Sequence, residues 1–372
     1  MKIFYLSILT LMIAGQFSCA VSNSETLVYF GTYTRGPSKG IYVSKMDSNS
    51  GALTPPILAA EINNPSFVAL HPNKKFLFAV VETGGDKAVV TSFSINPDGT
   101  LKKINEQPSK GTAPCHVSVD STGKVLMIAN YAGANCASFP IAEDGTIGSG
   151  NYYNHTGSSV NKSRQKEPHL HSINVDPQNK RAFVADLGID KIVVYNLDPS
   201  KATLMKHSAI SLPPGGGPRH FSFHPSGKFA YSNLELTRQI VAMTYDSENG
   251  VLKQQQVLST LPEGAPANGS TAECLVHPSG KWVYVSNRGH NSVAVFAIDQ
   301  NTGLLKMVEV EPTLSKIPRG FGISPDGRFL IVGHQDSDKI NVFKINQQTG
   351  ELDFTGNSVS VNAAVNVRFL SR

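Results

Sequence analysis

A histidine, a glutamate and two arginines stand at matching places in short related stretches of this chain. His171 lies in HLHS, Arg219 in GPRH, Glu235 in NLEL and Arg288 in SNRG. An imidazole transfers protons near neutral pH, and guanidinium groups bind carboxylates, phosphates and oxyanions. These four residues are the predicted catalytic group, with His171 or Glu235 as the general base and the two arginines as anion-binding groups.

One stretch indicates how two of these residues meet. In GGGPRHFSFHPSGKFAYSNLEL, residues 215–236, two strand-like runs flank the turn sequence HPSGK. A hairpin places the start of its first strand beside the end of its second. We therefore expect Arg219 to lie next to Glu235 and to lower the pKa of that carboxylate.

The same hairpin occurs repeatedly along the chain. Six copies span residues 64–83, 113–132, 167–188, 217–236, 270–289 and 317–336. Each continues into a third strand and a turn, and seven such turns end at Leu53, Leu101, Ile147, Leu204, Leu252, Leu305 and Leu352. A four-stranded unit that repeats every roughly 40 to 50 residues is typical of a β-propeller blade. The chain is predicted to be all-β, a seven-bladed β-propeller over residues 24–372.

The two ends of the chain should complete one blade. Residues 27–31 and 40–46 match the second and third strands of the first unit, whose opening strand is missing. The C-terminal run 362–370 supplies a suitable strand. N- and C-terminal strands are therefore expected to close the ring in one blade, which removes free sheet edges.

The first strand of every propeller blade lines the central channel, so the repeat predicts which side chains surround one channel mouth. The strand starts carry Ser66, Cys115, His171, Arg219, Ala272 and Arg319, followed by Phe67, His116, Ser172, His220, Glu273 and Gly320. The second strands end at Glu82, Asn130, Asp186, Glu235, Arg288 and His334. From this ring the predicted substrate-binding residues are His116, His220, Arg319 and His334. Most residues at such a mouth simply contact water, and only the combination of base, carboxylate and guanidiniums indicates a site.

Two further features concern the ends of the blades. An insertion at residues 149–167 should overhang the same mouth and bring Lys162, Arg164 and Lys166 with it. The histidines of the His-Pro turns should be structural, at the opposite end of the blades: His71, His224 and His277.

Composition excludes several classes of function. The chain has 372 residues, of which 40% are hydrophobic and 16% charged, and its net charge of +5 is scattered. Because no basic stripe is present, nucleic acid is not expected as a partner. The histidines form no HxxxH or Cys/His set, so neither a metal site nor any other cofactor is expected.

The N-terminus indicates export. Lys2 precedes an apolar run from Ile3 to about Ala14, and small residues follow, so residues 1–20 are predicted to be a signal peptide. Cys19 leaves open a lipoprotein signal, and the protein would then be either periplasmic or a membrane-anchored lipoprotein. The other cysteines, Cys115, Cys136 and Cys274, are expected to be buried thiols, with a Cys115–Cys136 pair as the alternative.

An ordered set of motifs resembles the lactonase family of seven-bladed propellers, which includes bacterial 6-phosphogluconolactonases and fungal carboxy-cis,cis-muconate lactonizing enzymes. The motifs are YFGTYT (29–34), PHLHS (168–172), GPRHFSFHPSGKFAY (217–231), VSNRGHNSVAVF (285–296) and PRGFGISPDGRFLIVGHQDSD (318–338). The resemblance implies a metal-independent site of a histidine, a glutamate and arginines, which falls on His171, Arg219, Glu235 and Arg288. Leu234 stands where the family more often has asparagine.

The function implied by this resemblance is hydrolysis of a sugar-acid lactone, a small-molecule substrate, by a monomer. Phosphorylated gluconolactone is made in the cytoplasm, so export would favour another sugar lactone. Two alternatives remain open at this stage. One is a lactonizing cycloisomerase that acts on a carboxymuconate-type acid, and the other is a non-catalytic exported propeller that binds a glycan or a partner protein.

Overall fold

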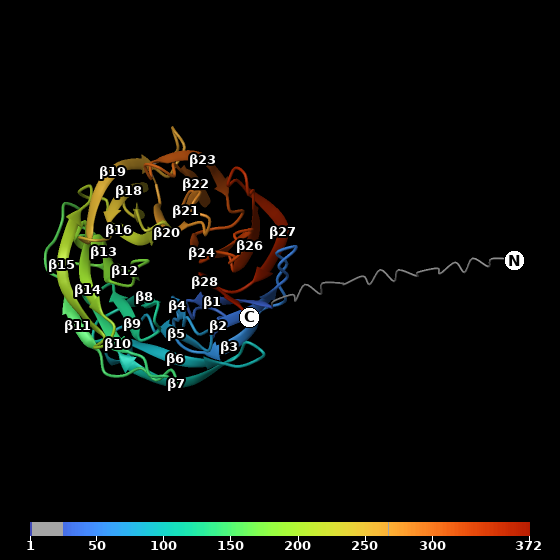
Figure 1. Cartoon of the computed structure of the whole chain (residues 1–372), viewed down its shortest axis with the longest axis horizontal. Coiled ribbons are helices and arrows are strands. Elements are labelled where there is room, and N and C mark those ends of the chain that lie inside the picture. The colour runs from blue at the N-terminus through green and yellow to red at the C-terminus, as the bar shows by residue number, and fades with distance from the viewer. Residues whose placement is uncertain (2–24, 267) are drawn as a thin grey trace.

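Seven four-stranded antiparallel sheets surround a central channel in the computed structural model (Figure 1). The structure describes Met1 and residues 25–266 and 268–372. The predicted all-β, seven-bladed propeller is therefore confirmed. The predicted signal peptide and Cys19 lie outside the described residues, apart from Met1.

The first four blades, each from the channel outward, are as follows. Blade 1 consists of β28 (Ala364–Ser371), β1 (Thr26–Thr32), β2 (Gly40–Met46) and β3 (Ile57–Glu61). Blade 2 consists of β4 (Val68–Leu70), β5 (Phe76–Val80), β6 (Val89–Ile95) and β7 (Leu101–Pro108). Blade 3 consists of β8 (Pro114–Val119), β9 (Val125–Asn130), β10 (Asn135–Pro140) and β11 (Asn151–Asn154). Blade 4 consists of β12 (Leu170–Val175), β13 (Arg181–Asp186), β14 (Lys191–Asp198) and β15 (Thr203–Ser211).

The remaining three blades have the same order. Blade 5 consists of β16 (Pro218–Phe223), β17 (Phe229–Leu234), β18 (Gln239–Asp246) and β19 (Val251–Ser259). Blade 6 consists of β20 (Ser270–Val276), β21 (Trp282–Arg288), β22 (Ser292–Ile298) and β23 (Leu305–Pro312). Blade 7 consists of β24 (Pro318–Ile323), β25 (Phe329–His334), β26 (Lys339–Ile345) and β27 (Leu352–Ser360). The helical turns η1 (Gly85–Lys87) and η2 (Leu187–Ile189) are short, and no helix in the described part of the chain could cross a membrane.

The two ends of the chain meet in blade 1, as predicted. β28 pairs with β1 in antiparallel register, with Tyr29 opposite Arg368. On its other sides β28 contacts β24 and β4, so it occupies the channel-lining place between blades 7 and 2 (Figure 1). This arrangement closes the ring and gives blade 1 its four strands.

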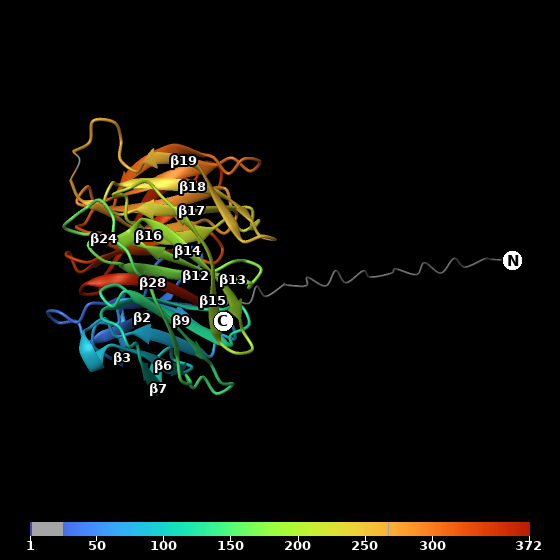
Figure 2. The same ribbon diagram turned by 90° about the vertical axis from the view of Figure 1, so that its left-hand side faces the viewer.

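The hydrophobic core lies between the blades, which stand side by side around the ring when the molecule is viewed from its edge (Figure 2). Each buried cluster joins two neighbouring sheets; Phe78 and Val80 of blade 2, for example, pack with Ile128 and Phe139 of blade 3. Because both faces of a sheet are covered, the second strands are largely apolar, and FLFAV at Phe76–Val80 is apolar throughout. This packing keeps the first strands at fixed positions around the channel.

Side chains in the turns also link neighbouring blades. The imidazole Nε2 atoms of His71, His224 and His277 contact the turn carbonyls of Gly123, Gly280 and Gly327, at 2.8, 2.9 and 2.8 Å. Gly123 has φ +73°, and a Cβ there would lie 2.4 Å from the His71 ring, so this turn requires glycine. The predicted structural role of these three histidines is confirmed.

Tyr284 makes an equivalent link, and its loss should be measurable. Its hydroxyl donates a buried hydrogen bond of 2.9 Å to the carbonyl of Gly350 in blade 7. The Tyr284→Phe variant leaves this acceptor unsatisfied, so we expect the free energy of unfolding in urea to fall by about 1–2 kcal/mol. The Tyr42→Phe control removes a more exposed hydroxyl and should change it by less than about 0.5 kcal/mol. Equal stability of the two variants would contradict this interpretation.

Candidate active site

Irregular pairing at the starts of the first strands turns the candidate site residues toward the channel. The ladder passes from Pro114 to His116 and leaves Cys115 as the extra residue, and in the same way it leaves His171 and Arg319. In β16 both Arg219 and His220 fall within the break. A bulge leaves a residue unpaired and redirects its side chain. The bulges therefore supply the geometry that brings separate blades to one site.

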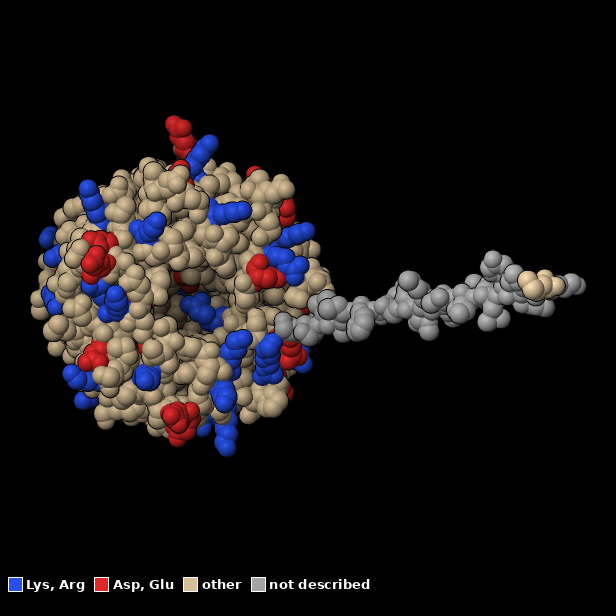
Figure 3. All heavy atoms as spheres, in the orientation of Figure 1, with Lys and Arg blue, Asp and Glu red and all other residues tan. Residues whose placement is uncertain are grey.

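A cavity of about 300 Å³, here called the mouth cavity, lies among these residues. It is lined by Glu82, Cys115, Tyr131, Arg164, His171, Glu235, Ser270, Arg288 and Arg319. A smaller inner cavity is lined by Tyr33, Ser66, Phe67, Glu82, Cys115, His171, Arg219, His220, Arg319 and Val365. Figure 3 looks into the central opening from one face, and basic side chains are visible inside it.

Glu235 binds three guanidinium groups. Its Oε1 accepts from Arg164 Nη2 at 2.8 Å, and its Oε2 lies 2.9 Å from Arg219 Nε and 3.0 Å from Arg288 Nη2. The predicted contact with Arg219 is therefore present. Burial alone would raise the pKa of this carboxylate, but the three positive charges lower it to about 2. Such a carboxylate is a poor proton acceptor, and its geometry instead suits it to orient the guanidiniums.

Asp190 holds the two segments that carry Arg164 and Arg219. In the insertion, the Ser159 hydroxyl and Gln165 Nε2 donate to its carboxylate at 2.5 and 2.7 Å. In the loop before β16, the amides of Gly215 and Gly217 donate to it, each at 2.7 Å. One buried aspartate thus fixes the insertion against the glycine-rich loop. As expected, the insertion overhangs the mouth, although only its arginine lines the mouth cavity.

His171 is buried and lines both cavities. Its Nδ1 lies 3.7 Å from Cys115 Sγ, and its ring meets the edge of Tyr131 at a centroid distance of 5.4 Å. Burial, and then the charge of Arg219, lowers the pKa of His171 well below its usual value. The imidazole is therefore uncharged at neutral pH, which is the form that can accept a proton.

Arg219 and His220 lie deeper in the channel. Arg219 Nη1 donates to His220 Nε2 at 3.1 Å and to the carbonyl of Ala272 at 2.5 Å. His220 Nδ1 in turn forms a short contact with Glu273. Both residues line the inner cavity rather than the mouth cavity. In this geometry His220 and the Ala272 carbonyl position the Arg219 guanidinium, which in turn holds Glu235.

Arg288 and Arg319 present positive charge to the mouth cavity. Arg288 Nη2 also donates to the carbonyl of Thr271 at 2.8 Å. Burial lowers the pKa of Arg288 to about 9, so the group remains a cation at neutral pH. The Arg319 guanidinium lies over the Tyr33 ring, 5.5 Å from its centroid. Both side chains are thus placed to contact an anion in the cavity.

Two of the predicted substrate-binding histidines lie outside both cavities. His116 packs against Phe67, with ring centroids 4.3 Å apart. His334 is fully buried, and its Nδ1 donates to the carbonyl of Lys339 at 2.9 Å. Alignment of the repeats placed them near the mouth, but packing and a strand-end hydrogen bond engage their rings elsewhere.

Three residues that line the mouth cavity were not among the predicted catalytic and substrate-binding residues: Glu82, Tyr131 and Ser270. Glu82 stands at the aligned second-strand end, the position that Glu235 occupies in its own blade, and this signal was available in the repeat. Tyr131 is selected only by contact, since it accepts a 3.0 Å hydrogen bond from Arg164 and stacks on His169. Cys115, Cys136 and Cys274 are buried thiols, as expected, and no two of them are joined.

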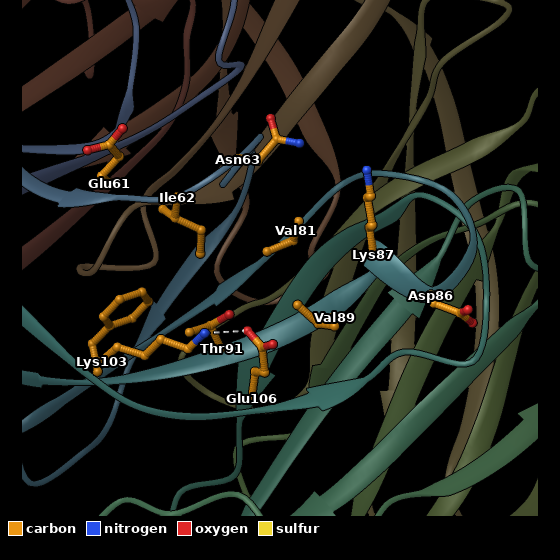
Figure 4. Close-up of a pocket in the computed structure, with 11 residues that line it drawn as sticks. Glu61, Ile62, Asn63, Val81, Asp86, Lys87, Val89, Thr91, Lys103 and Glu106 are labelled. Carbon is orange, nitrogen blue, oxygen red and sulfur yellow. Dashed lines mark hydrogen bonds and ion pairs between the residues drawn. The ribbon is translucent and has the colours of Figure 1, made fainter.

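A larger cavity, of about 430 Å³, lies in the groove between blades 1 and 2 (Figure 4). Its charged lining includes Lys103 and Glu106, whose side chains are 2.6 Å apart. None of the predicted site residues lines it, and it contains neither histidine nor arginine.

Among the described residues, no three His, Cys, Asp or Glu side chains are grouped so that they could hold a metal ion.

Comparisons with known proteins agree with the seven-bladed propeller fold. Residues 27–369 match the family model described as "Lactonase, 7-bladed beta-propeller". The chain is 37% identical to a 6-phosphogluconolactonase of Bacillus subtilis (79% of this chain, 83% of that protein) and 35% identical to one of Formosa agariphila (80% and 86%). The structure of a periplasmic gluconolactonase of Pseudomonas aeruginosa superposes with a TM-score of 0.89 at 33% identity, over 94% of this chain and 99% of that one.

Proposed function

The chain belongs to the lactonase family of seven-bladed β-propellers, and we propose that it hydrolyses the lactone of a sugar acid in the mouth cavity. The observation that carries the proposal is a single cavity of about 300 Å³ in which a buried neutral imidazole lies among guanidinium groups. The imidazole transfers protons, and the guanidinium groups stabilise negative charge. No metal ion is required for either step.

The reaction proceeds in two steps. His171 accepts a proton from water while the water oxygen bonds to the lactone carbonyl carbon, and the carbonyl electron pair moves to its oxygen. Arg288 and Arg319 line the cavity and hold this oxyanion or the substrate's anionic group. Collapse of the tetrahedral intermediate then breaks the ring C–O bond. The proton passes from His171 to the leaving alkoxide, which gives the open hydroxy acid.

Arg288 should act mainly in binding the substrate's anion. The Arg288→Ala variant removes a cavity-lining cation, and we expect KM to rise about 10- to 100-fold with a smaller change in kcat, because charge-assisted hydrogen bonds form in the ground state as well. Steady-state kinetics with an anionic lactone measure this. A fall in kcat at constant KM would instead assign Arg288 to the oxyanion.

Titration of the released acid tests the proposed activity. Purified protein is added to glucono-δ-lactone and to its 6-phosphate in a pH-stat, and the rates are compared with those of a blank. Acceleration of either reaction supports the proposal, and the ratio of the two rates gives the preference for phosphate. If no aldonolactone is hydrolysed faster than in the blank, the proposal fails. Loss of diene absorbance with a carboxymuconate would show a lactonizing reaction instead.

We also propose that the protein is exported and acts as a monomer outside the inner membrane. The N-terminal pattern of residues 1–20 supports export, and a structural neighbour of similar length is a periplasmic gluconolactonase. Mass spectrometry of the native protein measures both the cleavage site and any lipid on Cys19. An intact N-terminus in a cytoplasmic fraction would contradict export, and light scattering tests the monomer.

A further inference from the structure

Carboxylate residues occupy three of the aligned positions at the ends of the second strands: Glu82, Asp186 and Glu235. The carboxylate of Asp186 is occupied, because it contacts His155 Nδ1 at 2.7 Å and accepts from the amide of His169 at 2.8 Å. Glu235 is occupied by its three guanidinium groups. The repeat therefore allows the three carboxylates to be compared. Those of Asp186 and Glu235 hold neighbouring protein groups in place.

Glu82 differs from the other two. It lines both cavities, and among the described residues its side chain has one hydrogen-bond partner, the Tyr33 hydroxyl, which lies 3.2 Å from each oxygen. An ionised carboxylate offers about four acceptor sites, and a single hydroxyl donor uses only a small part of them. The Glu82 carboxylate thus retains acceptor capacity beside the mouth cavity, and Tyr33 holds it in place.

The chemistry of the cavity wall indicates what these acceptors bind. Arg164, Arg288 and Arg319 already provide the contacts for an anionic group. A carboxylate would repel a second anion but would accept strong, charge-assisted hydrogen bonds from hydroxyl groups. Neighbouring hydroxyls of a sugar ring are donors of this kind. A substrate without them would cover the carboxylate and leave it unpaired, which carries a cost.

We propose that Glu82 is a specificity-determining residue that binds ring hydroxyl groups of the substrate and thereby selects polyhydroxylated lactones. This inference rests on the proposed lactone hydrolysis. It divides the mouth cavity into a cationic part for the acyl oxygen or an anionic substituent and an acceptor part for hydroxyls. It also disfavours substrates that carry several carboxylates, such as carboxymuconates.

The test compares two lactones that share a six-membered ring ester. Glucono-δ-lactone carries the hydroxyl groups, and δ-valerolactone lacks them. For Glu82→Gln we expect kcat/KM with gluconolactone to fall about 10- to 100-fold, the effect of weakening charged hydrogen bonds, while kcat/KM with valerolactone stays within about 2-fold of wild type. Glu82→Ala should enlarge the difference. The Glu106→Gln variant removes a carboxylate of the same blade outside the cavity and should alter neither rate.

The outcomes are distinguishable. Equal losses with both lactones would assign Glu82 to catalysis or folding and overturn the inference. Full activity of the variant with both lactones would overturn it as well. The melting temperature of each variant shows whether an equal loss reflects unfolding. If wild-type protein hydrolyses no aldonolactone faster than the blank, the proposed function itself fails and the inference fails with it. Wild-type turnover combined with an unchanged ratio overturns the inference alone.

Discussion

Glu235→Gln should lose nearly all activity and much of the protein's stability. The substitution keeps the size of the side chain but removes the negative charge that three guanidinium groups share in a buried site. Removal of one partner from a buried ion pair costs about 3–5 kcal/mol of unfolding free energy. We expect kcat/KM to fall by at least about 10²-fold because the guanidiniums would no longer be held in place.

The measurements are urea unfolding and lactone hydrolysis, with Glu25→Gln as the control. Glu25 pairs with Lys45 at the surface, so its loss should cost at most about 1 kcal/mol and leave the rate unchanged. Similar behaviour of the two variants would contradict the central role of Glu235. Turnover that is present in wild type and lost in Glu235→Gln would also exclude a propeller that only binds ligands.

The pH dependence of stability gives a second readout for Glu235. Its pKa is lowered from 4.5 to about 2 on folding, so its contribution is fully present above pH 4.5 and is lost as the pH falls through about 2. The unfolding free energy of wild type should therefore drop over this acidic range. Glu235→Gln should drop less, because the titrating group is absent. Parallel curves for the two proteins would contradict the assignment.

His171→Ala is the second substitution with a large expected effect. Loss of the proton acceptor should lower kcat by about 10²-fold or more, and KM should change less because anion binding depends on the arginines. Steady-state kinetics of the His171→Ala and Arg288→Ala variants separate proton transfer from anion binding. If His171→Ala kept full kcat while Arg288→Ala abolished it, this assignment of roles would be wrong even with lactone hydrolysis intact.

The pH profile of the wild-type rate tests the environment of His171. Burial lowers its pKa well below 6.5, so the neutral imidazole persists through neutral pH and the acidic limb of kcat should lie well below pH 6.5. Arg219, His220 and Arg319 face the ring and all disfavour its protonated form. A midpoint near 6.5 would show that the site is more open to water than its packing indicates.

Local patterns in the sequence were sufficient to determine the architecture. A strand, a Pro/Gly turn and a second strand are specified by neighbouring residues, so the repeat could be counted and the unpaired strands at the two ends assigned to one blade. The contact of Arg219 with Glu235 followed in the same way, because a hairpin brings its own ends together. The structural role of the histidines in the His-Pro turns could likewise be predicted from neighbouring residues.

Tertiary structure decided which side chains share the site. The bulges that turn His171 and Arg319 toward the channel interrupt pairing in ways that the strand pattern does not encode. Arg164 reaches Glu235 because Asp190 ties the insertion to a distant loop. Packing removed His116 and His334 from the cavity, and burial shifted the pKa of His171. Each of these effects depends on contacts between residues far apart in the chain, which sequence spacing does not determine.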